Sequence, residues 1–250
     1  MKKLYLFPVL ILSFSIFNCK TPIPNDSQSQ AREIYFVSEA TKELSYFLIF
    51  SPQQAKSPLP VLYLLNGGGA NPYAWISGAN LQKEADKHGM IIVSLTTGMT
   101  GNYEYVNSLV DTTKKYEDYV LEIIKIVDDN YDTKNSRYFR GIGGISNGAI
   151  GALYIASRNP GIFISASALS GGTYGSYFPE YDNFREINLL IDIGTDDNLI
   201  GNVRELHDTL VSRDILHEYN EYPGGHNWAF WGAHYKEHMS FHNGIFDKYR

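Results

Sequence analysis

Short apolar runs, each followed by a loop rich in Gly, Asn or Asp, place the strongest constraint on the fold of this chain. Residues 61–65 (VLYLL), 90–95 (MIIVSL) and 187–193 (INLLIDI) are almost continuously apolar. Such runs are typical of strands that are buried on both faces, as in a parallel sheet. Helical spacing occurs between them, for example in residues 116–131, whose apolar side chains share one face opposite a charged one.

This alternation predicts an α/β fold with a mostly parallel central sheet, right-handed crossovers and helices on both faces. The other predicted strands are residues 33–37, 44–50, 137–143, 164–169 and 216–222, and the other predicted helices are residues 81–88, 149–158, 202–212 and 228–242. Residues 173–185 are too few for a separate cap domain. We find no internal repeat and no second-domain boundary, and therefore expect one domain from residue 33 to residue 250.

The N-terminus resembles a bacterial lipoprotein signal. Met1-Lys2-Lys3 precedes an apolar run at residues 4–17, which is shorter than the roughly 20 residues that a membrane-spanning helix needs. Cys19, the only cysteine, follows closely, so residues 1–18 are predicted to be a signal peptide and Cys19 the acylated first residue of the mature chain. Asn18 replaces the usual Gly, Ala or Ser at its position. Secretion without lipid and an uncleaved anchor are therefore the alternatives.

Residues 19–32 are polar and contain proline, which is typical of a flexible tether. Each of these arrangements places the domain outside the cytoplasm, and the single cysteine allows no disulfide within the chain. The net charge is −6, and removal of residues 1–18 leaves 19 basic against 27 acidic side chains, a net of −8. Such a surface has no basic footprint for nucleic acid. Membrane attachment is therefore expected through lipid and not through charge.

Four distinctive loops follow predicted strands. They are Asn66-Gly67-Gly68-Gly69, Gly144-Ile145-Ser146-Asn147-Gly148, Gly194-Thr195-Asp196-Asp197 and Gly224-Gly225-His226. The carboxyl ends of parallel strands lie at one edge of a sheet, where such proteins place their sites. The second loop fits Gly-x-Ser-x-Gly, the nucleophile elbow of α/β-hydrolases, in which a sharp turn strains the serine backbone. We therefore predict that Ser146 is a nucleophile within a site built from all four loops.

The nucleophile needs a histidine that accepts its proton and a carboxylate that orients this histidine. In α/β-hydrolases the three residues follow in the order Ser, Asp or Glu, His. His226 alone lies in a glycine-rich loop after a strand, so it is the predicted base. The other six histidines are His88, His207, His217, His234, His238 and His242. His88 precedes the serine. His207 and His217 fall in a predicted helix and a predicted strand, where solvated or packed roles are expected.

Three further histidines, His234, His238 and His242, recur every four residues on the predicted closing helix. That spacing is compatible with a metal site, but no Cys or carboxylate cluster accompanies it. We therefore interpret these histidines as a solvated helix face.

The predicted acid is Asp197, three residues after Gly194. Adjacent residues in a turn point in different directions, so only one of Asp196 and Asp197 can face His226. Asp192 lies within the predicted strand, where a structural contact is expected.

Two backbone N–H groups should hold the oxyanion of the tetrahedral intermediate. We predict that they belong to Asn147, directly after the nucleophile, and to Gly68, in the loop after residues 61–65. A phosphate-binding loop is excluded because no Lys-Ser/Thr pair follows the glycines, and Gly-x-Gly-x-x-Gly does not fit either.

With these residues placed, the chain resembles the putative-esterase family of α/β-hydrolases, which includes esterase D (S-formylglutathione hydrolase), feruloyl and acetyl-xylan esterases, enterochelin-type esterases and mycolyltransferases. The resemblance extends from about residue 33 to the C-terminus and rests on VLYLLNGGG, SRYFRGIGGISNGA, IGTDDNL and YPGGHNWAFW. It supports Asp197 as the acid and implies an α/β-hydrolase fold. Asn66 stands where the family usually has His, and Asn147 where Met or His is common. Neither change removes a catalytic group.

The resemblance implies a serine esterase that works through an acyl-enzyme and needs no metal or organic cofactor, and the N-terminal signal predicts that it is extracytoplasmic. Acyl transfer to a sugar or lipid and a catalytically silent binding lipoprotein are the alternatives. Aromatic residues make up 14% of the chain, which indicates either ordinary packing or an aromatic-walled cleft for a sugar or aryl ester. The candidate cleft residues are Tyr73, Trp75, Tyr103, Tyr105 and Trp228. The family's range of substrates leaves the acyl and alcohol groups open.

Overall fold

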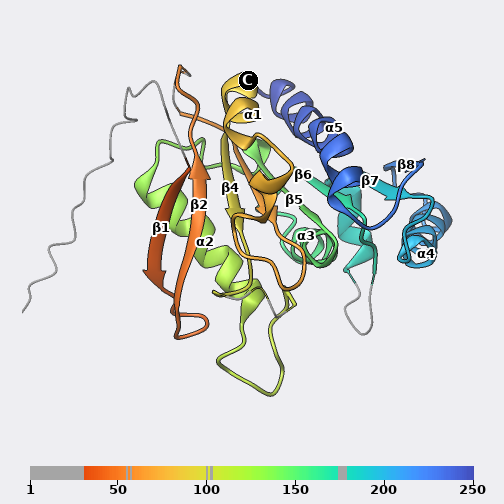
Figure 1. Cartoon of the computed structure of the whole chain (residues 1–250), viewed down its shortest axis with the longest axis horizontal. Helices are drawn as coiled ribbons and strands as arrows, with labels where there is room; N and C mark the ends of the chain where they lie inside the picture. The colour runs from red at the N-terminus through yellow and green to blue at the C-terminus, as the bar shows by residue number, and fades with distance from the viewer. Residues whose placement is uncertain (1–30, 55, 57, 100, 102–103, 174–178) are drawn as a thin grey trace, which may run out of the picture.

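A central sheet of eight strands organises the part of the chain that the structure describes (Figure 1). The structure is a computed structural model, and it describes residues 31–54, 56, 58–99, 101, 104–173 and 179–250. The predicted signal peptide, Cys19 and the candidate cleft residue Tyr103 lie outside these residues. None of the described helices has both the length and the apolar character that crossing a bilayer requires.

The strands lie in the order β1-β2-β4-β3-β5-β6-β7-β8. Their bounds are β1 Arg32–Val37, β2 Leu44–Phe50, β3 Val61–Leu65, β4 Ile91–Leu95, β5 Arg140–Ile145, β6 Ser165–Leu169, β7 Asn188–Gly194 and β8 Glu218–Tyr222. β2 is antiparallel to both of its neighbours, β1 and β4, and every other neighbouring pair is parallel. The prediction of an α/β fold with a mostly parallel sheet is therefore confirmed.

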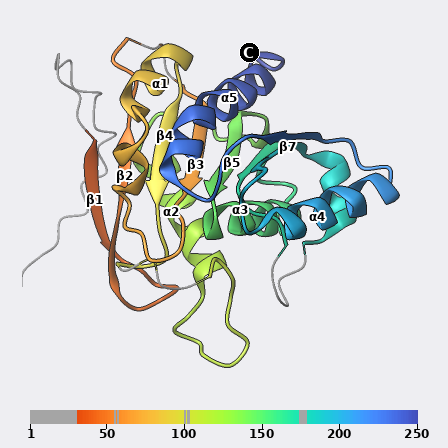
Figure 2. The same ribbon diagram turned by 45° about the vertical axis from the view of Figure 1, so that its right-hand side comes forward.

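Helices cover both faces of the sheet (Figures 1 and 2). They are α1 Leu81–His88, α2 Tyr116–Asn130, α3 Asn147–Arg158, α4 Ile200–Ser212 and α5 Trp228–Asp247, with short 3₁₀ turns at η1 Ala74–Ser77, η2 Arg137–Phe139 and η3 Tyr181–Glu186. The apolar faces of α2, α3 and α4 form one core with side chains such as Tyr63, Val93 and Ile142. α1 and α5 form the second core on the opposite face, with Leu62 and Ile92.

Residues at the helix ends satisfy backbone groups that the helices leave unpaired. The side chain of Asn80 accepts a hydrogen bond from the Lys83 N–H at 3.0 Å and begins α1, and Gly89 ends it in the left-handed region, with φ of 58°. Asn227 begins α5 by accepting from the N–H groups of Ala229 and Phe230 at 3.0 and 3.2 Å. Asn227 directly follows His226, so this cap also fixes where the predicted base leaves its loop.

The strand predicted at residues 137–143 is wrong in its first part. Residues 137–139 form the 3₁₀ turn η2, and β5 begins only at Arg140. The reason is that both neighbouring strands begin opposite this point, with Val61 paired to Arg140 and Ser165 paired to Gly141. Earlier residues therefore have no strand to pair with. The Arg137 guanidinium instead donates to the carbonyl oxygens of Phe163 and Glu186, at 3.2 and 2.6 Å.

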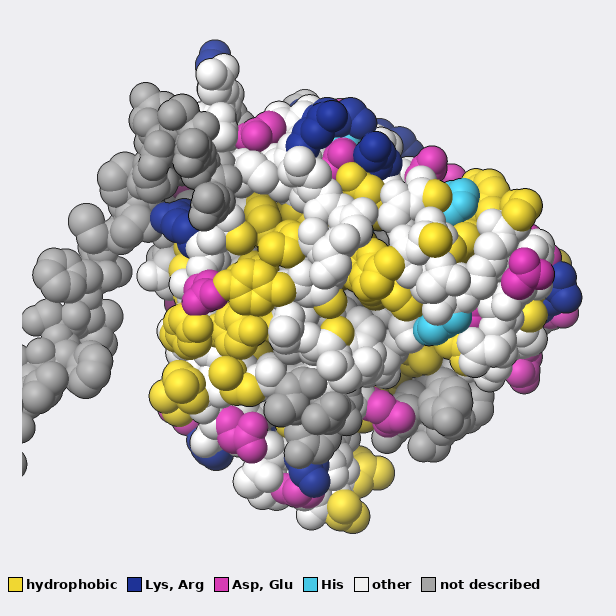
Figure 3. All heavy atoms as spheres, in the orientation of Figure 1, with side chains coloured by type: hydrophobic (Ala, Val, Ile, Leu, Met, Phe, Trp, Pro, Cys, Tyr) yellow, Lys and Arg dark blue, Asp and Glu magenta, His cyan; other side chains and the backbone are white. Residues whose placement is uncertain are grey.

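An apolar face of β1 and β2 is left uncovered by the helices. Tyr35, Val37 and Leu44 are each more than half exposed, and the pairing of Val37 with Leu44 puts all three on one side of the ribbon. Figure 3 shows apolar side chains gathered over this region of the molecule. Tyr35 stacks on Tyr46 with ring centroids 5.3 Å apart.

The expectation of a solvated histidine face on the last helix is wrong for His238 and His242. Both are buried, because α5 lies across the sheet with this side inward. His238 Nε2 lies 3.1 Å from Asp192 Oδ2. His242 Nδ1 and Nε2 lie 2.7 and 2.9 Å from the hydroxyl oxygens of Ser165 and Ser167 on β6. A Cβ atom on Gly141 of β5 would lie 2.6 Å from His242 Nδ1, so glycine there makes room for the ring.

The buried imidazole of His242 should make stability depend on pH. Burial, helped by the nearby His238, lowers the pKa of His242 from 6.5 to about 3. Between these values the unfolded chain binds a proton that the folded chain does not. The free energy of unfolding should therefore fall as pH decreases below 6.5, by up to about 1.4 kcal/mol per pH unit from this group.

Urea unfolding of the wild type and His242→Gln at pH 7 and pH 5 tests this contribution. The variant should be less stable at pH 7 but should lose less stability between the two pH values. His234→Gln, which changes a half-buried ring stacked on Tyr222, is the control and should keep the wild-type dependence. An unchanged pH dependence in His242→Gln would contradict the assignment.

The start of α3 packs so closely on the end of β3 that no side chain fits between them. A Cβ atom on Gly148 would lie 2.2 Å from the carbonyl oxygen of Leu65 and 2.7 Å from that of Asn66, both of them backbone atoms. Gly148→Ala should therefore lower the free energy of unfolding by about 1–3 kcal/mol. Gly161→Ala is the matched control, because a Cβ atom there meets nothing within 4 Å. Equal urea midpoints for the two variants would show that the packing is looser than described.

Candidate active site

Ser146 occupies the single residue between β5 and α3. Its backbone has φ of 54° and ψ of −123°, a region that residues with a side chain seldom adopt. Hydrogen bonds on both sides hold it there. Its N–H donates to the carbonyl oxygen of Leu169 on β6 at 3.0 Å, and its own carbonyl oxygen accepts from Ala149 and Ile150 at 2.9 and 3.2 Å. The strained turn that the motif predicted is therefore present.

Glycines surround this turn because the backbone segments next to Ser146 lie too close together to leave room for side chains. A Cβ atom on Gly144 would lie 2.3 Å from the backbone carbon and oxygen of Gly148. Gly171, which follows β6, packs equally closely, since a Cβ atom there would lie 2.5 Å from the Ser146 carbonyl oxygen. The serine side chain is thus left to project from the turn.

The side chains of Ser146, His226 and Asp197 form one chain of hydrogen bonds. Ser146 Oγ lies 2.8 Å from His226 Nε2. His226 Nδ1 lies 2.9 and 3.1 Å from the two carboxylate oxygens of Asp197. A carboxylate only accepts, so Nδ1 carries a proton in this pair and Nε2 is left to accept the proton of the serine hydroxyl. The Asp197 carboxylate is fully buried, whereas about a quarter of the His226 side chain is exposed.

Asp197 is the one carboxylate, of the three weighed from the sequence, that contacts His226. Its Oδ1 also accepts from the Leu199 N–H at 2.8 Å, which fixes its direction. Asp196 is exposed. Asp192 is buried and contacts Asn220 Nδ2 at 2.9 Å in addition to His238, so the structural role expected for it agrees with its contacts.

Two loops from neighbouring strands hold Asp197 and His226 together. The N–H of Thr195 donates to the Tyr222 carbonyl oxygen and that of Asp196 to the Gly224 carbonyl oxygen, both at 2.8 Å. A Cβ atom on Gly194 would lie 2.2 Å from the Gly224 oxygen. Glycine at position 194 therefore lets the loop that carries Asp197 press against the loop that carries His226. β7 and β8 are adjacent in the sheet, and this pairing continues beyond their ends.

The glycine loop after β3 lies beside the serine. A Cβ atom on Gly67 would lie 3.4 Å from Ser146 Cβ, and one on Gly68 would lie 3.7 Å from Asn147 Cβ. The Gly69 N–H donates to the Gly101 carbonyl oxygen at 2.8 Å, so it is already engaged. Gly68 and Asn147, the two residues predicted to hold an oxyanion, are thus neighbours in space.

Buried polar contacts support this loop from below. Asn66 Nδ2 donates to the Leu95 carbonyl oxygen at 2.8 Å and to Ser94 Oγ at 3.1 Å. The Tyr105 hydroxyl donates to the Asn66 carbonyl oxygen at 3.0 Å. Asn66 therefore occupies a supporting position in the loop.

Two of the candidate cleft residues are wrong as cleft walls. Trp75 and Tyr105 are each 1% exposed, because Trp75 packs in the core with α5 and Tyr105 lies against Gly151 of α3. Both support the glycine loop instead, since the Trp75 indole N–H points to the Leu65 carbonyl oxygen at 3.4 Å. Tyr73 and Trp228 are partly exposed. They remain candidates.

Sequence reasoning missed Trp231. Its ring meets the His226 imidazole edge to face, with centroids 5.0 Å apart and planes at 86°, and it packs in the same way on Trp228 at 5.4 Å. The available signal was its position three residues after Trp228 on a helix, which places both rings on one face. Trp231 thus restricts the orientation of the predicted base.

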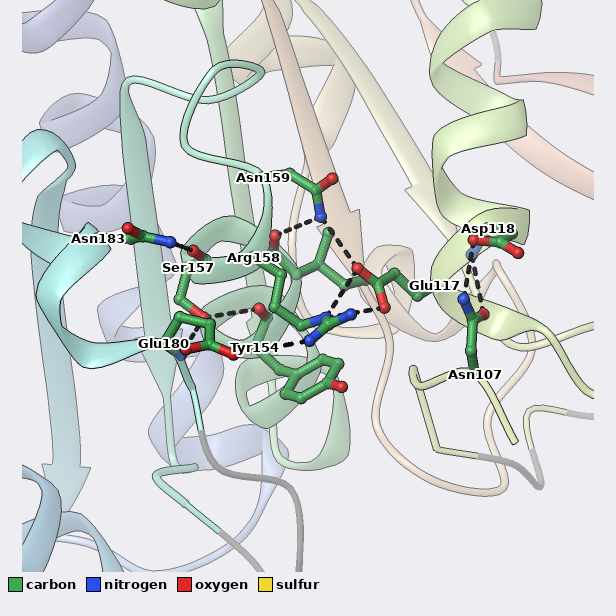
Figure 4. A network of polar contacts seen from close by, with 10 residues as sticks. Asn107, Glu117, Asp118, Tyr154, Ser157, Arg158, Asn159, Glu180 and Asn183 are labelled. Carbon is green, nitrogen blue, oxygen red and sulfur yellow. Dashed lines mark hydrogen bonds and ion pairs between the residues drawn. The ribbon is translucent and has the colours of Figure 1, made fainter. Parts of the chain in front are cut away.

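The far end of α3 is fixed by a polar network (Figure 4). Arg158 Nε lies 3.1 Å from both carboxylate oxygens of Glu117 at the start of α2, and Asn159 Nδ2 donates to the same carboxylate at 3.1 Å. Ser157 Oγ accepts from the Glu180 N–H at 3.0 Å. α3 begins directly after Ser146, so these contacts hold the helix whose first turn borders the serine.

Comparison with known proteins places this chain in a family. Residues 38–239 match the family model described as "Putative esterase". The chain is 27% identical over 158 residues to an endo-1,4-beta-xylanase/feruloyl esterase of Xylanibacter ruminicola, an alignment that covers 57% of the chain but only 22% of that relative. It is 27% identical over 212 residues to the S-formylglutathione hydrolase of Mus musculus, covering 66% of the chain and 74% of the relative.

Solved structures share the fold. A ferulic acid esterase superposes with a TM-score of 0.77 at 20% identity, covering 87% of this chain and 98% of that one. The family match spans most of the described domain, from the turn after β1 to the middle of α5. The chain therefore belongs to this esterase family of α/β-hydrolases, which are serine hydrolases.

Proposed function

We propose that this protein hydrolyses carboxylic esters through a Ser146-His226-Asp197 triad and an acyl-enzyme. The observation that carries the proposal is the continuous chain of hydrogen bonds, with Ser146 Oγ 2.8 Å from His226 Nε2 and His226 Nδ1 2.9 Å from Asp197 Oδ2. Membership of an esterase family supports the same chemistry.

In the first half of the reaction, Ser146 Oγ attacks the ester carbonyl carbon while its proton passes to His226 Nε2. The buried Asp197 carboxylate stabilises the imidazolium that forms. The carbonyl oxygen becomes an oxyanion, which the N–H groups of Gly68 and Asn147 hold. Collapse of the tetrahedral intermediate breaks the bond to the alcohol, which leaves with the proton from His226.

In the second half, water takes the place of the alcohol. His226 removes a proton from this water as it attacks the acyl carbon, and returns the proton to Ser146 Oγ when the acid leaves. About a quarter of the His226 side chain is exposed, so water can reach the imidazole ring. The enzyme thus returns to its starting state, and each proposed step uses only the named residues, the ester and water.

We propose Tyr73 and Trp228 as walls of the substrate cleft. Tyr73 follows the glycine loop by four residues, and Trp228 lies two residues after His226. Both rings are partly exposed. Aromatic walls suit the aryl part of an ester, and one similar protein is named a ferulic acid esterase.

Replacement of the nucleophile should abolish most of the activity. Ser146→Ala should lower kcat/KM for p-nitrophenyl acetate by about 10³-fold or more, because no other group can form the acyl-enzyme. Ser212→Ala, which changes an exposed serine at the end of α4, should keep wild-type rates. A fluorophosphonate probe should label the wild type and the Ser212 variant but not Ser146→Ala. Full activity in Ser146→Ala would refute the proposed triad.

We further propose that the mature protein is anchored outside the cytoplasm by lipid at Cys19. The supporting observation is the basic start, the apolar run and the single cysteine that follows it. In a bacterial host, Cys19→Ser should move the protein from the membrane fraction to the soluble fraction and prevent labelling by a radioactive fatty acid. Ser27→Ala, a change in the predicted tether, should alter neither property. Fatty-acid labelling that persists in Cys19→Ser would contradict the anchor while leaving the triad untouched.

A further inference from the structure

Two histidines outside the candidate active site face each other across a short gap. His207 lies on α4 and His217 lies directly before β8, and His207 Nδ1 is 2.8 Å from His217 Nε2. Both side chains are partly exposed. The esterase chemistry described above uses neither of them.

Each ring is held in its orientation by a second contact. His217 Nδ1 lies 2.8 Å from the Ile215 carbonyl oxygen. His207 stacks on Tyr219 of β8, with ring centroids 4.1 Å apart and planes at 13°. The pair is therefore supported by the backbone on one side and by an aromatic ring on the other.

These contacts determine where the protons are. A carbonyl oxygen only accepts, so His217 Nδ1 carries the proton of the neutral ring and His217 Nε2 presents a lone pair to the gap. The single proton in the gap belongs to His207 Nδ1. The neutral His207 ring has a second form, in which the proton is on Nε2. In that form both facing nitrogens present lone pairs. The net charge of the pair does not change.

The chemistry of the two facing nitrogens suits a transition-metal ion. Imidazole nitrogens bind Zn²⁺ at about 2.0–2.1 Å in a tetrahedral arrangement, which separates two such nitrogens by about 3.3 Å. To hold an ion, the two nitrogens must move apart from 2.8 Å and the rings must turn until both lone pairs point at it. Metal-binding histidines usually donate their other N–H to a carbonyl or carboxylate, as His217 does to Ile215.

The surroundings allow a cation to enter. His217 lines a surface groove of about 550 Å³, whose charged residues are the acidic Glu186, Asp214 and Glu218 and the basic Arg185 and Lys248. The carboxylate of Glu221 beside Tyr219 is already bound by the Arg204 guanidinium, with two contacts of 2.7 Å. No group of three or more His, Cys, Asp or Glu side chains in the described part of the chain is arranged around a common metal position. The protein would therefore supply two ligands, and water the others.

We propose that His207 and His217 form a two-histidine binding site for Zn²⁺ or a similar divalent transition-metal ion. The bound ion links α4, which begins three residues after Asp197, to the segment that enters β8 and leads to His226. It thus ties together the two segments that carry the acid and the base. The proposal does not depend on the esterase reaction.

Zn²⁺ binding to the full-length, chelator-treated protein tests this site. Equilibrium dialysis should find a zinc ion that is absent from both His207→Gln and His217→Gln. Mass action predicts that Zn²⁺ at a hundredfold excess over its dissociation constant raises Tm by about 5–10 °C in the wild type. The comparison is the change in Tm with and without Zn²⁺ within each variant, so a lower starting stability does not affect it.

His234→Gln is the matched control, because it removes a partly exposed histidine that stacks on Tyr222. This variant should keep both the bound zinc ion and the rise in Tm. Absence of zinc binding in the wild type would overturn the proposal and leave the pair as a simple hydrogen bond. A zinc effect that is equal in the wild type and both paired variants would overturn it as well, since the ion would then bind elsewhere.

Discussion

The close approach of backbone to backbone at the carboxyl edge of the sheet is the constraint on which the candidate site depends. Ser146 adopts φ of 54° only because hydrogen bonds from β6 and from the first turn of α3 hold it on both sides. The turn that contains Ser146 also needs Gly144 and Gly148, where a Cβ atom would lie within 2.3 Å of backbone atoms. Strain at one residue is thus maintained by close packing at several others.

The same principle brings Asp197 to His226. Gly194 lets two loops touch, and backbone hydrogen bonds from Thr195 and Asp196 hold them in contact. Below them, α5 is attached to the sheet by buried polar groups, with His238 on Asp192 and His242 on two serines of β6. These contacts have defined directions, whereas apolar packing alone would let the helix slide. The helix that follows His226 therefore has one position on the sheet.

Much of the fold could be predicted because its signals are local. Continuous apolar runs marked β3, β4 and β7, and the spacing of apolar residues marked α2. Prediction was wrong where neighbours decide the outcome. Residues 137–139 are extended in character but have no strand beside them. His238 and His242 look like a solvated face in sequence, yet they point at serines and a carboxylate that only the folded sheet brings under the helix. Trp75 and Tyr105 lie near the site in sequence but face the core.

By itself, the sequence determined the order of the elements, the elbow around Ser146 and the loops in which its partners would lie, because turns, glycines and hydrophobic periodicity act over a few residues. Only the tertiary structure decided which side chains meet. Asp196 and Asp197 are adjacent and chemically equal, and the direction of each depends on how the loop after β7 rests on Gly224. Likewise, the contact of Trp231 with His226 and the facing pair His207 and His217 arise from elements that pack together in space. Contacts of this kind depend on the positions of whole elements, which no short stretch of sequence encodes.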